Sequence, residues 1–543
     1  MPENISEERG PRYFRDKGWW RDETLPGWLD RNALANGDSL AVETLDGPIA
    51  YRELNERVCG FASVLRRLGI ARGDVVAVHL PNIPEFLIAW LAINACGAIM
   101  QTIHLPYGLR EIEHLLSHSG AKAIIALGAA KERSPAGELV ALGKTMPSLR
   151  AVISVGRDVA GAETFGAPAH DGARAAVKSE VAADDPFLLL YTSGTTSAPK
   201  AVSVSFNHFL SNARLAAGEF GLTAADRILC LAPFTHLYGL YTLQLGLCVG
   251  ASASMVPVFT PPDFIKALQK MRPTVLFGAP GHIAACLQQR LFEGVNLESM
   301  RIAVLSGTAV PPALSAAFEH MLPRGKVMQA WGMTELQFGT CGRPADPRDV
   351  RFNSVGRAMP GTELRIASTG DRVLAAGETG ELQVRGCSVF SGYVGNAEAT
   401  AESFTADGWF RTGDLAEMDA GGNVRLQGRT KDIINRGGVK FNPVEVEAVI
   451  ASHPAVAQVA IAPIPDQLLG ERAACFVVLH EQAKLAFDDL KRFLAERNVA
   501  KFMWPEQLEI VADMPMTPTR KVIKPELVRR ALAQSDLRGR PAA

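Results

Sequence analysis

Short apolar runs of strand length alternate with helical patterns along the first 430 residues of the chain. Strands are expected at DVVAVHL (74–80), AKAIIAL (121–127), TVLFGAP (274–280) and IAVLSGT (302–308). IPEFLIAWLAINACGA (83–98), between the first two of these strands, is expected to form a helix. Strand–helix alternation favours right-handed crossovers, so the pattern predicts an α/β fold with largely parallel sheets covered by helices.

The pattern changes from about Glu363 onward. ELRIAS (363–368), GELQVRG (380–386) and NVRLQG (423–428) are short alternating segments between Gly and Asp turns, which predicts a small antiparallel sheet or distorted barrel. The last block combines two helical patterns with strands such as VAQVAIAPI (456–464), as a small α+β domain does. We therefore expect a large domain over residues 1–430 and a smaller one over 431–543, with a polar, disordered tail from Ser535.

Composition and charge exclude several classes of protein. The chain has 543 residues and a net charge of -1, so it has no overall basic field and nucleic-acid binding is not expected. The eight cysteines are scattered without a C-x-x-C pair, which favours reduced thiols. The polar start does not resemble a signal peptide, and the apolar stretch over 86–100 is too short to span a bilayer. A soluble, cytoplasmic protein without an integral membrane segment is expected.

The segment YTSGTTSAPK (191–200) follows an apolar strand and offers hydroxyl donors, a glycine and a lysine within ten residues. It is not a Walker A loop, because Lys200 is followed by Ala201 and no G-x-x-x-x-G-K-[ST] occurs. Hydroxyls, close backbone approach and one positive charge nevertheless suit phosphate oxygens. Taken alone, the segment is equally compatible with a polar turn.

Further segments follow in a fixed order: APFTHLYGL (232–240), LSGTAVPP (305–312), QAWGMTE (329–335), GWFRTGDL (408–415), GRTKDIINRGGVKFNPVEVE (428–447) and MTPTRKVIK (516–524). Together they resemble the acyl-adenylate-forming (AMP-binding) superfamily in its acyl-CoA synthetase branch. INRGGVKF and the N-terminal RYFRDKGWWRDETL are similar to cyclohexanecarboxylate and aryl-acid CoA ligases. The resemblance implies that an acid and ATP give acyl-AMP and pyrophosphate, and that CoA then gives acyl-CoA and AMP. ATP, Mg²⁺ and CoA are the implied cofactors and co-substrates.

The resemblance assigns residues to adenylation. Glu335 would ligate the Mg²⁺ that bridges phosphates, although an exposed carboxylate at the start of a helix would look the same in sequence. Thr334 would contact the α-phosphate, and Trp331 would stack on adenine unless it is a plain core aromatic. Asp414 would accept both ribose hydroxyls, with Arg429 nearby. Other implied nucleotide-binding residues are Thr192, Ser193, Gly194, Thr195, Thr196, Lys200, Gly307, Thr308, Ala309, Ala330, Gly332 and Met333.

The C-terminal domain of the superfamily is mobile, and the resemblance assigns residues there too. Lys521 would offset the charge that develops between carboxylate and α-phosphate. Lys431 would be the hinge that lets the small domain rotate, unless it is an ordinary exposed linker residue. Rotation would then present Arg436, Gly437 and Gly438 to the pantetheine arm of CoA.

Three residues depart from the superfamily pattern: Ser197 and Ala201 stand where glycine is common, and Arg520 precedes Lys521 in place of glycine. If the loop requires a positive φ, each of the first two substitutions costs about 1 kcal/mol or more. Because the charged residues of the site are retained, we interpret the site as catalytic. A catalytically silent acyl or nucleotide binder is the remote alternative.

His236 would border and gate the acyl pocket, although a lone histidine is often only a packed or surface residue. Dihydroxybenzoate-activating relatives carry an asparagine in this block that reads a ring hydroxyl, and APFTHLYGL has none. An unhydroxylated, mostly apolar cyclic, aromatic or medium-chain acid is therefore expected. With no carrier domain evident, CoA is the expected acceptor; a stand-alone aryl-acid enzyme that loads a carrier protein is the alternative. A homodimer is left open.

Overall fold

The structure is a computed structural model, and it describes residues 10–166, 181–192, 200–436, 439–466, 469–517 and 522–537. The described residues form two compact units. The first unit holds the residues up to Thr192, those from Lys200 to Glu363, and Val384–Phe410; the second holds Leu364–Gln383 and the residues from Arg411 onward. The domain boundary at residue 430 stays a prediction.

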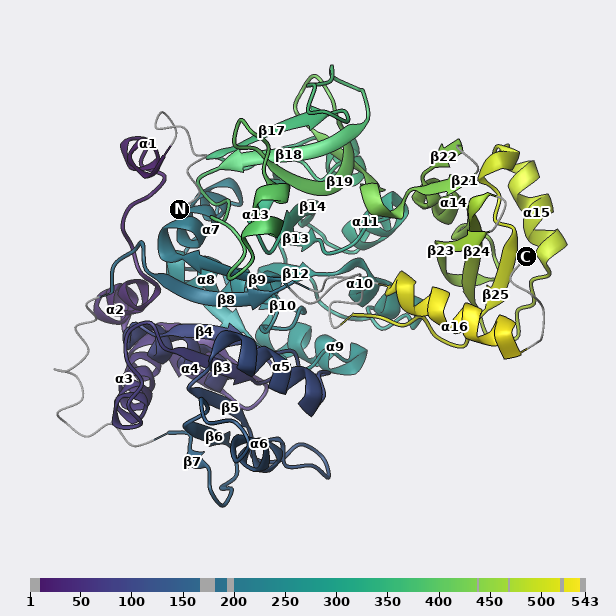
Figure 1. Cartoon of the computed structure of the whole chain (residues 1–543). Coiled ribbons are helices and arrows are strands. Elements are labelled where there is room, and N and C mark those ends of the chain that lie inside the picture. Colours follow the sequence, from purple (N-terminus) through teal and green to yellow (C-terminus); the bar gives the residue numbers. More distant parts are fainter. Residues whose placement is uncertain are drawn as a thin grey trace. The chain divides into compact units, whose positions relative to one another are not determined.

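The first unit contains a nine-stranded sheet (Figure 1). In spatial order its strands are β16 (Arg357–Ala358), β15 (Gln337–Cys341), β14 (Lys326–Met333), β13 (Ile302–Leu305), β12 (Val275–Gly278), β10 (Arg227–Cys230), β11 (Ser252–Ser254), β1 (Leu40–Glu43) and β2 (Pro48–Ala50). The strands from β14 to β1 pair in parallel, and antiparallel strands lie at both edges. The strands predicted around residues 274–280 and 302–308 are confirmed as the fully buried β12 and β13.

A seven-stranded sheet forms the other half of the first unit. Its strands in spatial order are β7 (Glu163–Thr164), β6 (Ala151–Val155), β5 (Ala123–Leu127), β3 (Val75–His79), β4 (Ile99–Thr102), β8 (Pro186–Tyr191) and β9 (Ala201–Ser205). All neighbours pair in parallel except β8 and β9. The predicted strands at 74–80 and 121–127 are confirmed as β3 and β5.

Helices cover both sheets of this unit, as the alternating pattern predicts (Figure 1). The predicted helix at 83–98 is α4, which begins at Pro84, ends at Ala95 and contacts β3 and β4. Almost all of its residues are buried, so its sequence is apolar on every face. The helices are α1 (Pro11–Asp16), α2 (Leu25–Asn36), α3 (Tyr51–Arg67), α4 (Pro84–Ala95), α5 (Leu109–Ser119), α6 (Pro135–Gly143), α7 (Phe206–Glu219), α8 (Leu237–Val249), α9 (Pro261–Met271), α10 (Pro280–Gln288), α11 (Pro312–His320), α12 (Arg348–Asn353) and α13 (Ala397–Ser403).

The second unit holds most residues of a four-stranded sheet, in the order β17 (Thr362–Ala367), β18 (Gly380–Gly386), β19 (Phe410–Met418) and β20 (Val424–Arg429). The strands β17, β18 and β20 are those that the alternating segments predict. Strand β19 is not among the expected strands, because its first residues, FRTGDL, belong to the motif GWFRTGDL. It pairs antiparallel with β20, which places Asp414 opposite Arg429.

The rest of the second unit is the predicted α+β block. A five-stranded sheet combines β22 (Val439–Phe441), β21 (Ile434–Arg436), β24 (Gly470–Leu479), β23 (Val456–Asp466) and β25 (Gln507–Ile510). It is accompanied by α14 (Pro443–Ile450), α15 (Phe487–Glu496) and α16 (Lys524–Leu537). The prediction of a disordered tail from Ser535 is wrong as far as Leu537, because α16 continues through these residues. The α/β class with a smaller α+β part is confirmed.

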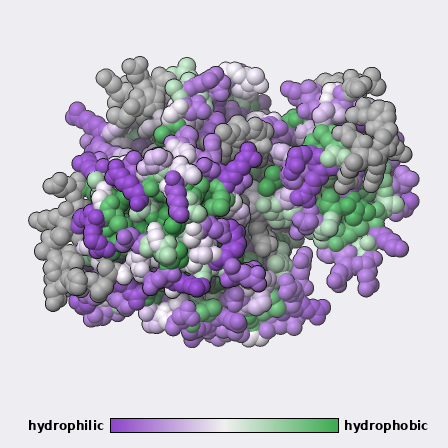
Figure 2. All heavy atoms as spheres, turned by 60° about the horizontal axis from the view of Figure 1, so that its bottom comes forward, coloured by the Kyte–Doolittle hydropathy of each residue, from purple (hydrophilic) through white to green (hydrophobic). Residues whose placement is uncertain are grey.

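The surface in Figure 2 is mostly hydrophilic, with hydrophobic residues scattered among the charged and polar ones. Among the described residues, no helix has both the length and the apolar character needed to cross a bilayer. The short apolar stretch over residues 86–100 is accordingly the buried helix α4 and the strand that follows it.

Candidate active site

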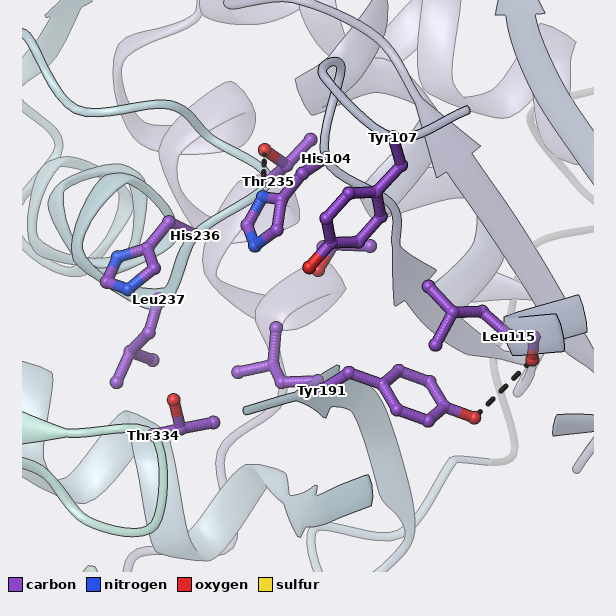
Figure 3. A pocket seen from close by; sticks show the side chains of 10 residues that line it. His104, Tyr107, Leu115, Tyr191, Thr235, His236, Leu237 and Thr334 are labelled. Atoms are coloured by element: carbon purple, nitrogen blue, oxygen red, sulfur yellow. Dashed lines mark hydrogen bonds between the residues drawn. The ribbon is translucent and has the colours of Figure 1, made fainter. Parts of the chain in front are cut away.

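A cavity lies in the first unit at the carboxyl ends of strands β4 and β8, next to the start of helix α8 (Figure 3). In sheets of this kind ligands bind beyond the carboxyl ends of the strands. The cavity is lined by Thr102, His104, Tyr107, Leu115, Leu190, Tyr191, Thr235, His236, Leu237 and Thr334. No Asp, Glu, Lys or Arg is among these described lining residues. Its volume is about 10 Å³, roughly the room for one water molecule.

His104 is held at the centre of this cavity by its neighbours. Its Nδ1 and the Thr235 Oγ1 share a hydrogen bond of 2.9 Å, and its ring packs edge-on against Tyr107 at 5.3 Å. The ring of His236 stacks on it at a centroid distance of 6.3 Å. Burial, together with nearby His79, lowers the pKa of His104 from 6.5 to about 4. The imidazole is therefore uncharged at neutral pH.

His236 is placed by helix α8, of which it is the N-cap residue. Its Nδ1 accepts a hydrogen bond from the Tyr238 backbone N–H at 3.2 Å, which orients the ring at the N-terminus of the helix. Gly239 follows in the first turn, and a Cβ there would lie 2.3 Å from the Pro233 carbonyl oxygen. The glycine in APFTHLYGL thus permits the tight approach that brings His236 to the cavity. Its predicted gating role stays a prediction.

Thr334 and Glu335 lie in the turn between the antiparallel strands β14 and β15. The turn is tight, because a Cβ at Gly332 would lie 1.9 Å from the Gln337 carbonyl oxygen. Thr334 faces the cavity, whereas Glu335 is only 5% exposed. The Glu335 carboxylate accepts a hydrogen bond of 2.8 Å from the Tyr393 hydroxyl. Thr334, predicted to contact the α-phosphate, therefore lies at the edge of the cavity, and the predicted Mg²⁺ ligand Glu335 follows it in the chain.

Strand β14 also carries the other residues predicted to contact the nucleotide. Trp331 is 5% exposed and lies opposite Thr340, as a core aromatic does. Its neighbour Ala330 is buried, and its carbonyl accepts a 2.7 Å hydrogen bond from the Ser306 hydroxyl. Gly332 and Met333 are half-buried. Stacking of Trp331 on adenine stays a prediction.

The predicted adenine and acyl loop follows strand β13. Gly307 is half-buried there, while Thr308 and Ala309 are exposed. The Ser306 bond to Ala330 ties this loop to β14. Both segments thus meet at the carboxyl ends of neighbouring parallel strands.

The predicted phosphate-binding segment YTSGTTSAPK (191–200) is described only at its two ends. Thr192 donates its backbone N–H to the Lys200 carbonyl at 3.0 Å, so the ends of the loop meet. The Lys200 ammonium lies 4.7 Å from the centre of the Tyr393 ring. Ala201 is buried in β9, and its carbonyl accepts a 2.9 Å hydrogen bond from the Val394 N–H. The remaining predicted phosphate residues lie outside the described residues: Ser193, Gly194, Thr195, Thr196 and, among the departures, Ser197.

In the second unit, Asp414 and Arg429 form an ion pair across strands β19 and β20. The Arg429 Nε lies 2.9 Å from Asp414 Oδ1, and Asp414 is only 6% exposed. Lys431 follows in a 3₁₀ turn (Thr430–Asp432). Burial, and then the charge of Arg429, lowers the pKa of Lys431. The two residues predicted to bind ribose are therefore together, next to the predicted hinge.

The predicted CoA-binding loop and catalytic lysine are described only in part. Arg436 ends β21, where its guanidinium pairs with Glu506 at 2.5 Å and donates to the Phe502 carbonyl at 3.2 Å. Gly437 and Gly438 lie outside the described residues, as do Arg520 and Lys521. The segment that carries Lys521 is anchored on both sides, because Met516 bridges Val522 and Ile523 N–H donates to the Pro515 carbonyl at 2.8 Å.

The ligands available near Glu335 fit a Mg²⁺ ion that is bound partly by the protein and partly by the substrate. Within the described ranges, no group of three or more His, Cys, Asp or Glu side chains is arranged to hold a metal ion. Mg²⁺ commonly takes only one or two protein carboxylates and completes its octahedron with phosphates and water. Glu335 alone at the end of β14 agrees with that mode of binding.

Sequence reasoning missed four aromatic or imidazole side chains that form this region: His104, Tyr107, Tyr191 as a cavity residue, and Tyr393. The first two lie in TIHLPYG, directly after the buried strand β4. Ligand sites lie beyond the carboxyl ends of parallel strands, so polar and aromatic residues directly after such a strand are a pattern that would have indicated both. Tyr393 contacts Glu335 across 58 residues of sequence, and no local pattern indicates that contact.

Comparisons with known proteins agree with this geometry. Residues 29–394 match the family described as AMP-binding enzyme, and residues 445–521 match the AMP-binding enzyme C-terminal domain. The (7a-methyl-1,5-dioxo-octahydro-1H-inden-4-yl)propanoyl:CoA ligase of Mycobacterium tuberculosis is 33% identical over 514 residues, which cover 93% of this chain and 98% of that protein. The feruloyl-CoA synthase of an Amycolatopsis species is 30% identical over 94% of this chain and 99% of its own length.

Among solved structures, ATP-bound MatB from Rhodopseudomonas palustris superposes with a TM-score of 0.80 at 27% identity. The match covers 93% of this chain and 98% of MatB. The family match spans more than half of the chain, and the relatives are matched over nearly their full lengths. The chain therefore belongs to the AMP-binding enzyme family, in its acyl-CoA synthetase branch, and is an ATP-dependent carboxylate–CoA ligase.

Proposed function

We propose that the substrate is an apolar cyclic carboxylic acid whose ring occupies the cavity around His104. The observation that carries this proposal is the division of the cavity into two ends (Figure 3). Thr334 and His236 lie at one end, which suits a carboxylate that must meet the α-phosphate. Tyr107, Leu115 and Tyr191 lie at the other end, which suits an apolar ring.

The electrostatics of the cavity support an apolar acid. Because the pKa of His104 is about 4, the ring is neutral at physiological pH. An acid with a second charge would find no opposite charge among the described lining residues, so it would lose hydration without compensation. The names of the M. tuberculosis and Amycolatopsis relatives contain a bicyclic and a feruloyl group, which supports a ring-bearing acid.

A ring-sized acid requires lining side chains to turn aside. The cavity of about 10 Å³ is far smaller than a six-membered ring. Tyr107 is the side chain we expect to move, because it is only half-buried and meets His104 through a ring contact. His236 is held by its N-cap hydrogen bond and is expected to stay.

In the proposed first half-reaction, the acid carboxylate attacks the α-phosphorus of ATP and pyrophosphate leaves. Lys200 and the hydroxyls of the 192–196 loop would hold the β- and γ-phosphates, and Thr334 would contact the α-phosphate. Glu335 would bind Mg²⁺, which supplies positive charge between the phosphates. Lys521 would offset the charge that builds up between the carboxylate and the α-phosphate.

In the proposed second half-reaction, the CoA thiolate attacks the acyl carbon and AMP leaves. Asp414 would keep the ribose in place, and the turn with Lys431 would act as the hinge. The loop formed by Arg436, Gly437 and Gly438 would then admit the pantetheine arm. A cytoplasmic location, a homodimer and the absence of nucleic-acid binding remain predictions of the sequence.

The test is pyrophosphate release from ATP and Mg²⁺ across an acid panel, with and without CoA. The panel contains cyclohexanecarboxylate, benzoate, hydroxylated benzoates and medium- to long-chain fatty acids. We expect turnover with one apolar cyclic acid and strong stimulation by CoA. One equivalent of pyrophosphate per enzyme, unaffected by CoA, would instead indicate that a carrier protein accepts the acyl group. No release with any acid would contradict the catalytic interpretation.

Two variants locate the acid. Tyr107→Ala should lower the KM for bulkier ring acids and leave the KM for ATP unchanged, because it enlarges only the ring end of the cavity. The matched control is Tyr13→Ala, since Tyr13 packs against Trp19 and does not line the cavity. An unchanged order of acid preference in Tyr107→Ala would place the acid elsewhere.

A further inference from the structure

We propose that Tyr393 is a positioning residue for adenylation, which holds the Glu335 carboxylate with its hydroxyl and the Lys200 ammonium with its ring. This inference rests on the proposed roles of Glu335 and Lys200. Tyr393 itself lies in the segment between β18 and α13, far in sequence from both residues.

Tyr393 contacts a negative charge through its hydroxyl and a positive charge through its ring. The phenol hydroxyl donates to Glu335 Oε1 at 2.8 Å. The Lys200 Nζ lies 4.7 Å from the ring centre, within the range of a cation–π contact. Within the described residues no ion pair joins Lys200 to Glu335, and the tyrosine provides a contact to each.

The backbone around Tyr393 is fixed to both partner segments. Val394 N–H donates to the Ala201 carbonyl at 2.9 Å, and Tyr393 itself forms a bridge with Val202. On the other side, Phe390 N–H donates to the Glu335 carbonyl at 2.7 Å. The segment 390–394 therefore connects the first residues of β9, at the end of the phosphate loop, to the turn that carries Glu335.

The side-chain direction of Tyr393 is fixed as well. Its backbone N–H donates to Thr400 Oγ1 at 2.9 Å, and its ring meets the Phe390 ring edge-on at 4.8 Å. Packing on an aromatic neighbour restricts the ring to one orientation. The hydroxyl therefore remains directed at Glu335 and one face of the ring remains available to Lys200.

The Lys200 ammonium and the Glu335 carboxylate have opposite charges, and each is needed to bind a different part of the substrate complex. A direct Lys–Glu ion pair would neutralise both charges, yet phosphate binding needs the ammonium and metal binding needs the carboxylate. A neutral tyrosine between them restricts both side chains without cancelling either charge. Groups oriented before the substrate arrives need less reorganisation during the reaction, which is the general basis of electrostatic preorganisation.

The test compares Tyr393→Phe, which removes only the hydroxyl, with Tyr393→Leu, which removes both contacts. Binding of ATP with Mn²⁺ as the metal probe is followed by electron paramagnetic resonance, and pyrophosphate release is measured against Mg²⁺ concentration. Tyr393→Phe should weaken metal affinity by about tenfold, the usual effect of losing a partner of a metal ligand. It should leave metal-free ATP binding unchanged, whereas Tyr393→Leu should also raise the KM for ATP.

Phe404→Leu is the control, because Phe404 packs on Phe390 and Phe410 in the same aromatic cluster and its described ring contacts are with these two. It should lower stability and leave the metal dependence unchanged. Metal binding and Mg²⁺ dependence equal to wild type in Tyr393→Phe would overturn the inference.

Glu335→Gln and Lys200→Met serve as reference variants: if they alter metal or ATP binding while Tyr393→Phe does not, only the inference fails. If they too change nothing, the proposed site itself is wrong.

Discussion

In the second unit, Lys524 Nζ lies 2.8 Å from Glu447 Oε1 and joins the first residue of helix α16 to helix α14. The same carboxylate oxygen accepts a 2.6 Å hydrogen bond from the Ile461 N–H on strand β23. Both side chains are mostly buried, at 19% and 17% exposure. The pair therefore fixes the chain just after Lys521 to the core of this unit.

Lys524→Met should slow acyl-AMP formation by roughly 5- to 30-fold, the factor that corresponds to one or two kcal/mol. The reason is that the segment with Lys521 loses its anchor, although Lys521 itself is unchanged. Transfer of the acyl group from preformed acyl-AMP to CoA should keep its rate, because the proposed role of Lys521 concerns adenylation alone. Single-turnover measurement of each half-reaction separates the two.

Lys524→Arg should retain most of the adenylation rate, because it preserves the charge next to Glu447. Lys491→Met is the matched control, since Lys491 forms an exposed pair with Asp488 within α15. Equal losses in both half-reactions for Lys524→Met would point to general destabilisation and contradict a positioning effect.

The pair of Asp414 and Arg429 leads to a prediction about the ribose of ATP. If Asp414 accepts the ribose hydroxyls, Asp414→Asn should raise the KM for ATP by about 10- to 100-fold, as the loss of a charged hydrogen bond does. The variant should also discriminate less than wild type between ATP and 2′-deoxy-ATP. Steady-state pyrophosphate release with both nucleotides measures this. Asp419→Asn, in the exposed turn after β19, is the control, and an unchanged preference for ATP in Asp414→Asn would refute the assignment.

The burial of His104 predicts a loss of stability at mildly acidic pH. Its pKa is about 4 in the folded protein and about 6.5 in the unfolded chain, so the unfolded chain binds the proton first as the pH falls. The contribution of His104 is therefore fully present above pH 6.5 and decreases between about pH 6.5 and 4. From pH 7 to pH 5, His104 alone should remove about 2 kcal/mol of the free energy of unfolding.

Urea unfolding of wild type and His104→Gln across pH checks this expectation. The variant should lose less stability from pH 7 to pH 5 than wild type, although His208, whose pKa burial also lowers to about 4, retains its own share. Above pH 8 the two pH profiles should run parallel, which serves as the internal control. Parallel profiles at all pH values would show that the ring is hydrated in the folded protein.

Much of the fold could be predicted from sequence because its signals are local. Helix α4 is apolar on every face and strands β12 and β13 are short buried runs, so composition and length were sufficient. Strand β19 has no such signal, because the buried positions of its alternating pattern include polar Thr412 and Asp414, and its pairing with β20 stabilises it. Helix α16 is not among the expected helices, and its last residues fall in the predicted tail because Ser535 and Asp536 are polar.

The candidate site, like the fold, could be predicted only where its signals are local in sequence. Motif order located the segments with His236, Glu335 and Asp414, since each motif is a continuous stretch of chain. The contacts between segments could not be predicted: Tyr393 meets Glu335 across 58 residues, and His104 meets Thr235 across 131. Such contacts depend on which strands become neighbours, and this information is not contained in any single segment.

Arg351 and Glu319 provide a prediction on stability that is independent of the site. Arg351 is 2% exposed and its guanidinium forms hydrogen bonds to Glu319, to the Val327 carbonyl at 2.6 Å and to the Asp346 carbonyl at 3.1 Å. Burial opposes ionisation of Glu319, but the hydrogen bonds from Arg351 and the Val327 N–H, together with the charges of Arg351 and Arg348, outweigh it and lower the pKa of that carboxyl. The pair is thus a buried, fully engaged ion pair between α12 and α11 in the first unit.

Arg351→Met should destabilise the enzyme by about 3–5 kcal/mol, because it leaves the Glu319 carboxylate and the Val327 carbonyl without their main partner. Arg348→Met should cost less than about 1 kcal/mol, since Arg348 approaches the same carboxylate at 3.6 Å from an exposed position. The double variant Arg351→Met with Glu319→Gln should recover part of the loss, because no uncompensated charge remains. Denaturant unfolding of these three variants and of the single variant Glu319→Gln measures all of this. If the double variant were as unstable as the two single losses added, the cost would come from packing and not from the isolated carboxylate.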